Sequence, residues 1–188
     1  MIIGVGFKKR VGKDSFYQLV HKFLPNRKVF RLAFADPLKN EIFKLVLEPN
    51  GLSYDLLDDE ETKPILRILV NWYGTDFKRN PKFGGKPNHW VDIILNQIQE
   101  ILAEYPDAII IITDMRYPNE VEAIEALGGF KVHVIRDEVD DPNLTHSSQT
   151  ILDSHPVDFD YTIDNNGTFE EYALKVEDVI KDILEKAT

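Results

Sequence analysis

The chain has 188 residues, which is enough for one compact α/β domain and short for two. It contains no cysteine, so neither a disulfide nor a thiolate metal site can form. Its net charge of −10 disfavours a nucleic acid polymer as a partner, and its local basic clusters suit a small anionic ligand better. No apolar run approaches the roughly 20 residues that span a bilayer, and the N-terminus is typical of a buried strand rather than a signal peptide. We therefore expect no membrane partner and a location in the cytosol.

Strands are expected to alternate with helices along the chain. The pattern first predicts a strand over 2–7, a helix over 12–24, a strand over 28–34, a helix over 36–47 that Asp36 caps, and a helix over 64–73 that Gly74 ends. It then predicts a helix over 89–105, a strand over 108–113, a helix over 119–127, strands over 131–135 and 159–163, and a helix over 168–186 that Thr168 caps. Residues 51–62, 76–88 and 137–158 are expected to lack regular structure. This alternation predicts parallel βαβ units, and the four consecutive isoleucines within 108–113 indicate a strand covered on both faces.

A phosphate-binding loop is predicted at Gly12-Lys13-Asp14-Ser15, because these residues follow a strand and open a helix. Backbone N–H groups at a helix N-terminus attract anions, and a lysine ammonium can follow the phosphate oxygens. Two features depart from the usual loop. Its first glycine is at Gly6 rather than position 7, and Asp14 stands where Ser or Thr normally follows the lysine. The Mg²⁺ ligand therefore stays open among Ser15, Asp14 and Asp114.

Several short motifs follow one another in a familiar order. They are residues 9–15, 34–39, Arg67 with 74–76, Trp90-Val91, 114–120, 128–129, 134–136, 145–146 and 165–168. In this order and spacing, the chain resembles the phage-type deoxynucleoside monophosphate kinases, a branch of the P-loop nucleoside monophosphate kinases. The resemblance implies an α/β, three-layer P-loop kinase fold with a five-stranded parallel sheet, helices on both faces and a helical arm or lid. It implies a single domain over 1–188, with an acceptor-binding arm at about 51–105 and a lid-like segment at about 137–158.

The same resemblance implies ATP and Mg²⁺ as cofactors and transfer of a phosphate group from ATP to a deoxynucleoside monophosphate. Phosphoryl transfer depends on positioning and positive charge more than on covalent chemistry. The residues expected in catalysis are Lys13, Arg67, Asp114 and Arg116. Those expected to bind ATP are Lys9, Arg10, Gly12, Lys13, Asp14, Ser15, Arg136 and Asn165. Those expected to bind the acceptor are Asp36, Arg67, Arg79 and Trp90, with Trp90 stacking on the base.

Plainer structural roles stay open for these residues. Asp36 could only cap its helix, Asp114 could pair with Arg116, and Trp90 could pack between arm and core. The arginines could be solvated surface charges. The segment 137–158 contains no arginine, although many nucleoside monophosphate kinases carry arginines in the lid.

Two other functions also stay open. The first is a P-loop kinase with another acceptor, such as a phosphomevalonate-like molecule or a modified base in DNA. The second is a nucleotide-binding module without catalysis. The sequence leaves open whether the chain pairs as a homodimer, and a phage origin, which would mean the host cytoplasm, rests on the resemblance alone.

Overall fold

The structure, a computed structural model, describes residues 1–6, 11–137 and 157–187. Its internal contacts divide the chain into two compact units. Unit 1 comprises Met1–Ala33 with Gln97–Thr188, and unit 2 comprises Phe34–Asn96.

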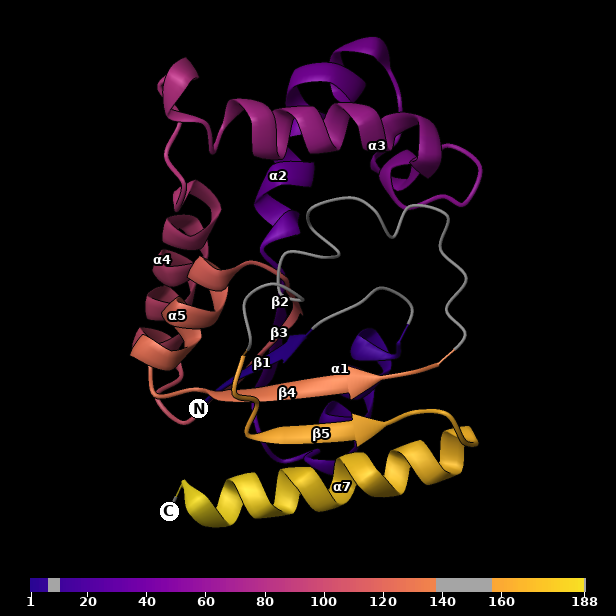
Figure 1. The fold of residues 1–188 in the computed structure, drawn as a ribbon, viewed down its shortest axis with the longest axis vertical. Helices are drawn as coiled ribbons and strands as arrows, with labels where there is room; N and C mark the ends of the chain where they lie inside the picture. The colour runs from indigo at the N-terminus through magenta and orange to yellow at the C-terminus, as the bar shows by residue number, and fades with distance from the viewer. Residues whose placement is uncertain (7–10, 138–156, 188) are drawn as a thin grey trace. The chain divides into compact units, whose positions relative to one another are not determined.

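Unit 1 is built on a five-stranded sheet in which every neighbouring pair is parallel (Figure 1). The strands are β1 (Ile2–Gly6), β2 (Val29–Leu32), β3 (Ile109–Met115), β4 (Phe130–Ile135) and β5 (Tyr161–Asp164), in the order β2-β3-β1-β4-β5. The isoleucine run lies in the second strand of this order, and residues Ile109–Ile112 are almost completely buried. The predicted five-stranded parallel sheet is confirmed.

Helices cover both faces of the sheet, as expected from its two apolar faces. α1 (Lys13–Phe23) and α7 (Phe169–Lys186) pack together on one face, over a core that includes Ile3, Val5 and Ile111. α5 (Pro118–Ala126) packs against β1 and β4 on the other face, where Gly4 lies against Ile124. Successive residues of a strand point to opposite faces of the sheet. Gly4 therefore faces α5, whereas its neighbours Ile3 and Val5 face α1 and α7. α4 (His89–Glu104) enters unit 1 at Gln97.

One predicted strand end in unit 1 is corrected by the structure. The isoleucine strand continues to Met115, so Asp114 lies inside β3 rather than just after it. The register between β1 and β3 shifts between Gly4 and Gly6, which places Gly6 opposite Met115. This irregularity lets β3 continue beyond the last regularly paired isoleucine.

Thr168 caps α7 as predicted, because its hydroxyl accepts a hydrogen bond from the Glu171 amide at 3.2 Å.

Unit 2 is a small, mostly helical cluster. Its elements are α2 (Ala35–Ile42), a π-helical turn (Phe43–Leu47), 3-10 turns (Glu48–Asn50, Tyr54–Leu57, Pro81–Phe83), α3 (Lys63–Asn71) and a second π-helical turn (Trp72–Phe77). Leu57, inside the segment predicted to be irregular, is buried with Ile42 and Leu47. The described parts of the chain contain no helix both long and apolar enough to cross a membrane.

Two expectations about unit 2 are wrong. Asp36 does not cap α2, because the helix begins one residue earlier and Asp36 lies in its first turn. Gly74 does not end α3, since the helix continues through it as a π-helical turn. This glycine is there for close packing: a Cβ atom on it would lie 2.5 Å from Cδ2 of Leu38.

Gly4→Ala is expected to destabilise the protein by about 1–3 kcal/mol through overpacking. The new Cβ would lie 2.2 Å from Cδ1 of Ile124, inside van der Waals contact. Ile124→Val removes that Cδ1, so the double variant should lose less stability than the two single variants added together. Urea unfolding of the four proteins measures this, and strictly additive losses would contradict the proposed clash.

Candidate functional site: an anion-binding pocket at the sheet edge

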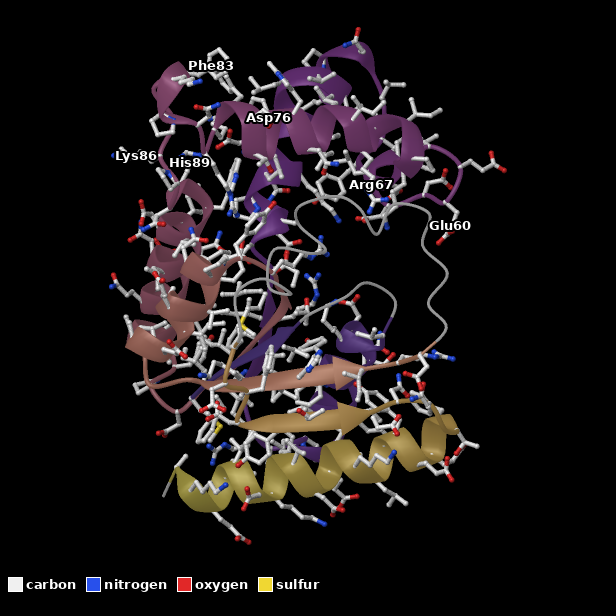
Figure 2. The ribbon with its side chains drawn as sticks, in the orientation of Figure 1. Glu60, Arg67, Asp76, Phe83, Lys86 and His89 are labelled. Carbon is white, nitrogen blue, oxygen red and sulfur yellow. The ribbon has the colours of Figure 1, made fainter. Side chains whose placement is uncertain are left out.

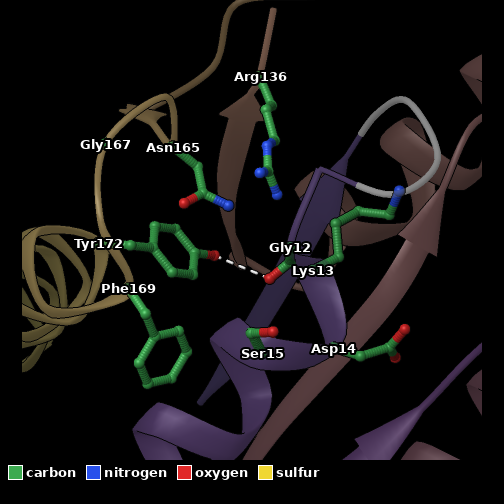
Figure 3. Close-up of a pocket in the computed structure, with 9 residues that line it drawn as sticks. All are labelled: Gly12, Lys13, Asp14, Ser15, Arg136, Asn165, Gly167, Phe169 and Tyr172. Atoms are coloured by element: carbon green, nitrogen blue, oxygen red, sulfur yellow. Dashed lines mark hydrogen bonds between the residues drawn. The ribbon is translucent and has the colours of Figure 1, made fainter. Parts of the chain in front are cut away.

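A pocket of about 410 Å³ opens where α1 begins, beyond the carboxyl ends of β4 and β5 (Figure 3). It is lined by Gly12, Lys13, Asp14, Ser15, Arg136, Asn165, Gly167, Phe169 and Tyr172. Ligands of parallel α/β sheets collect at this edge, because the loops that follow the strands gather there. All nine residues belong to unit 1.

The start of α1 is held in place by residues from the far end of the chain. Gly12 has φ 105°, a left-handed conformation that favours glycine, and its carbonyl accepts a hydrogen bond from the Tyr172 hydroxyl at 2.9 Å (Figure 3). Asn165 Nδ2 donates to the Val11 carbonyl at 2.8 Å. Among the residues that the structure describes, no side chain caps α1, so the amides of its first turn can face an anion.

Lys13 is only 7% exposed although it carries an ammonium group. Burial and, after it, the neighbouring charge of Arg116 lower the pKa of Lys13 to about 7, against the opposing effect of Asp114 and Asp14. The positive charge on Lys13 therefore lowers the stability of the free folded protein. A bound polyanion would stabilise it, so the site is suited to phosphate groups.

Arg116 lies directly after β3, next to the buried lysine. Its backbone N–H and that of Tyr117 both donate to the Glu120 carboxylate, at 2.7 and 3.1 Å. Its Nε is buried and has no hydrogen-bond partner among the described residues. A donor of this kind is costly unless a ligand accepts from it.

Arg136 extends from the end of β4 toward Gly12 (Figure 3). The next residue, Asp137, exchanges two hydrogen bonds with Asn166, its amide donating at 2.7 Å and its carboxylate accepting at 2.9 Å. This pair ties the end of β4 to the loop after β5. The tie fixes the two chain segments that carry Arg136 and Asn165.

Asp14 and Ser15 differ in what they offer a metal ion. The Asp14 carboxylate accepts a hydrogen bond from Arg31 Nε of β2 at 3.3 Å and is largely exposed, while Ser15 lines the pocket. Across residues 1–6, 11–137 and 157–187 there is no group of three or more His, Cys, Asp or Glu side chains arranged to hold a metal. Ser15 and Asp114 still fit Mg²⁺, which takes oxygen ligands and commonly needs only one or two from the protein beside substrate phosphates.

The structure thus gathers in one pocket all of the predicted ATP-site residues that it describes, with Arg116 and Asp114 close to Lys13. The predicted residues Lys9 and Arg10 lie outside the described residues, as does most of the predicted lid-like segment 137–158.

The predicted acceptor residues Asp36, Arg67, Arg79 and Trp90 all belong to unit 2. Arg67 lies on α3 and is half-buried (Figure 2). Trp90 is 1% exposed, and its indole N–H donates to the Gly74 carbonyl at 2.9 Å. This burial favours a packing role for Trp90 over stacking on a base.

A polar cluster in unit 2 surrounds Glu41. Its carboxylate accepts hydrogen bonds from the Tyr73 hydroxyl and the Lys78 ammonium, each at 2.8 Å, and His89 Nε2 lies 3.7 Å away. Burial opposes ionisation of Glu41, but these hydrogen bonds outweigh it and lower its pKa. The cluster holds α2, the π-helical turn after α3 and the start of α4 together.

Sequence reasoning missed Tyr172, Phe169 and Gly167 as pocket residues. Tyr172 has the spacing of an ordinary core residue of α7, so its hydroxyl gave no signal. Phe169 did carry a sequence signal, because it is an aromatic residue directly after the predicted helix cap Thr168. In the structure its ring is exposed. Gly167 is part of the motif 165–168 that the sequence singled out.

Comparison with known proteins identifies the family to which the chain belongs. A profile of the family described as deoxynucleotide monophosphate kinases matches residues 48–176. A protein of Acanthamoeba polyphaga mimivirus, provisionally named a deoxynucleotide monophosphate kinase, is 27% identical over 176 residues, covering 88% of this chain and 90% of that protein. Among solved structures, dephospho-CoA kinase from Campylobacter jejuni has a similar fold, with a TM-score of 0.51 and 17% identity over 100% of this chain and 98% of that one.

Lys13→Met is expected to stabilise the free protein by on the order of a few kcal/mol below pH 7, because it removes the buried charge. The pKa of Lys13 is about 7 when folded and 10.5 when unfolded. Between these pH values the unfolded chain holds a proton that the folded chain lacks, so the free energy of unfolding of the wild type rises as the pH rises. The gain should therefore shrink from pH 7 to pH 10.5.

Thermal unfolding of both proteins from pH 6 to pH 10 measures this difference. Lys22→Met, at an exposed lysine of the same helix, is the matched control and should change little. A Lys13→Met variant that is less stable than the wild type at pH 6 would contradict a costly buried charge.

Proposed function

Since the chain belongs to the deoxynucleotide monophosphate kinase family, we propose that it transfers the γ-phosphate of ATP to a deoxynucleoside monophosphate. The observation that carries the proposal is the buried Lys13 at the uncapped start of α1, in a pocket of the parallel sheet edge. The fold and the family make the chain a kinase of the P-loop type. The acceptor and the metal are part of the proposal.

ATP binding is assigned to the pocket of unit 1. The α1 amides and Lys13 bind the β- and γ-phosphates, since they supply converging positive charge. Arg136 and Phe169 flank the pocket and suit the adenine ring, because a guanidinium plane and an aromatic ring both stack on flat bases. Asn165 and Tyr172 act as positioning residues, since they hold Val11 and Gly12.

Mg²⁺ would be held by Ser15 and Asp114 together with oxygen atoms of the ATP phosphates. When bound, it would neutralise the phosphate charge. Asp14 is a weaker ligand candidate because its carboxylate is engaged with Arg31.

The transfer itself needs no proton acceptor if the acceptor phosphate is doubly ionised. One of its oxygens attacks the γ-phosphorus, the bond from that phosphorus to the β–γ bridging oxygen breaks, and ADP leaves. Arg116 is placed to stabilise the transferring group, because its buried Nε lacks a partner among the described residues and it lies close enough to Lys13 to lower that lysine's pKa.

Acceptor binding is assigned to unit 2, as the arm of a single kinase domain. Arg67 and Arg79 would hold the acceptor phosphate, since a guanidinium can donate two parallel hydrogen bonds to it. Asp36, in the first turn of α2, would accept from the nucleoside. Trp90 is assigned the packing of this unit through Gly74 rather than the base.

Lys13→Met is expected to lower kcat at least about 100-fold, because it removes a charge aimed at the transferring phosphate. The measurement is ADP release with each deoxynucleoside and ribonucleoside monophosphate in turn. Lys22→Met is the control and should keep wild-type rates. No turnover of any monophosphate by the wild type, or unchanged turnover in Lys13→Met, would overturn the proposed function.

Tyr172→Phe should weaken ATP binding about 3- to 10-fold while leaving kcat at saturating ATP nearly unchanged. It removes a hydrogen bond of roughly 1 kcal/mol to Gly12, whose carbonyl keeps its bond from the Phe16 amide at 2.9 Å. Calorimetric titration with a non-hydrolysable ATP analogue measures the affinity. Tyr161→Phe loses a comparable bond, to Asp182 at 2.6 Å, outside the pocket and should bind ATP normally. Equal losses in the two variants would contradict the positioning role.

A further inference from the structure

Glu120 carries a buried carboxylate to which the proposed function assigns no role. The residue is 1% exposed, and across residues 1–6, 11–137 and 157–187 it is the only acidic residue that is fully buried. Burying a carboxylate costs free energy unless hydrogen bonds compensate it. The groups that donate to Glu120 therefore indicate what this side chain does.

The Glu120 carboxylate closes the short connection between β3 and α5. β3 ends at Met115 and α5 begins at Pro118, so the connection consists of Arg116 and Tyr117. The backbone N–H groups of both residues donate to Oε2 of Glu120, at 2.7 and 3.1 Å. One carboxylate oxygen thus fixes the backbone of the whole connection.

A second helix of unit 1 has a similar cap without an arginine. Glu171, in the first turn of α7, accepts a hydrogen bond from the amide of the cap residue Thr168 at 2.8 Å. Such a bond to the cap residue is the usual contribution of a glutamate at this position of a helix. Glu120 also bonds Arg116, which precedes its own cap residue Tyr117, and this bond is the shorter of the two. The additional bond indicates a role beyond helix capping.

Arg116 is the residue that benefits from a fixed backbone. Its Nε is buried with no hydrogen-bond partner among the described residues, and its charge acts on Lys13. An arginine side chain has many rotamers, and ordering it around a ligand costs conformational entropy. A backbone that is held in advance limits where the guanidinium can lie, and a misplacement of about 1 Å can cost about 100-fold in rate.

We propose that Glu120 is a positioning residue for phosphoryl transfer, because it holds the Arg116 backbone where the guanidinium can meet the transferring phosphate group. This inference rests on the proposed function, in which Arg116 stabilises that group. Glu120 acts through the main chain of Arg116 and supplies no atom to the reaction. Its removal should therefore lower kcat, whereas ATP, which Lys13 and the α1 amides bind, should bind almost as before.

Steady-state kinetics separate this role from simple helix capping. Glu120→Ala should lower kcat about 10- to 100-fold, and the Kd of a non-hydrolysable ATP analogue should change less than about 3-fold. Glu120→Gln keeps an oxygen that can accept both bonds, so its kcat should stay within about 3-fold of the wild type. Glu171→Ala is the matched control: it removes the corresponding bond at the start of α7 and should keep kcat at saturating ATP.

A double-mutant cycle tests whether the effect passes through Arg116. Arg116→Ala removes the guanidinium, so adding Glu120→Ala to it should lower kcat by less than about 3-fold more. Thermal unfolding checks that every variant is folded at the assay temperature. Losses of kcat that multiply in the double variant would overturn the proposal, and so would equal losses in Glu120→Ala and Glu171→Ala.

An NMR readout makes the test independent of turnover. The buried Nε–H of Arg116 should give a slowly exchanging signal, identified by its absence from Arg116→Ala. The signal should persist in Glu120→Gln and Glu171→Ala and broaden or vanish in Glu120→Ala. If it does so while the wild type turns over no monophosphate, the proposed function fails and the positioning of Arg116 by Glu120 stands. A signal that is unchanged in Glu120→Ala would overturn the positioning role.

Discussion

A charged amine in a place that excludes water is the constraint around which unit 1 is organised. Lys13 is the first residue of a helix whose start is fixed by two hydrogen bonds from elsewhere in the chain. Arg116 adds a second positive group nearby, and the described acids only partly compensate. The free protein therefore stores an electrostatic cost, which phosphate groups would relieve under the proposed function, and the arrangement that weakens the fold is the one suited to a polyanion.

The sheet provides the rigidity that such a site needs. β1, which precedes Gly12 and Lys13 in the chain, lies between β3 and β4, so it ends next to the strand that carries Asp114 and leads to Arg116, and next to the strand that leads to Arg136. The groups that would act on a nucleotide thus come from four distant parts of the sequence, and parallel pairing brings their ends to one edge. Each is further fixed by a local bond, as with Glu120 behind Arg116 and Asn166 beside Asp137.

Sequence reasoning reached the architecture because the relevant signals are local. The isoleucine run, the alternation of strands with helices and the Thr168 cap are each readable within a few residues, and each was confirmed. It failed at Gly74 and Asp36 because helix ends there depend on packing: Gly74 permits contact with Leu38, and a helix that starts at Ala35 needs no side-chain cap. The place of the pocket at the start of α1 could be predicted from Gly12-Lys13. The roles of Tyr172 and of the buried Trp90 could not, since they depend on residues brought together only by the fold.

The two bonds that hold the start of α1 span 154 and 160 residues of sequence. A ribosome synthesises the chain from the N-terminus, so the loop at Gly12 is made first and its restraints last. The pocket therefore lacks Asn165, Tyr172 and their two hydrogen bonds until the last part of the chain has been synthesised. Premature termination anywhere before Asn165 leaves a product that contains Lys13 but lacks both hydrogen bonds to the start of α1.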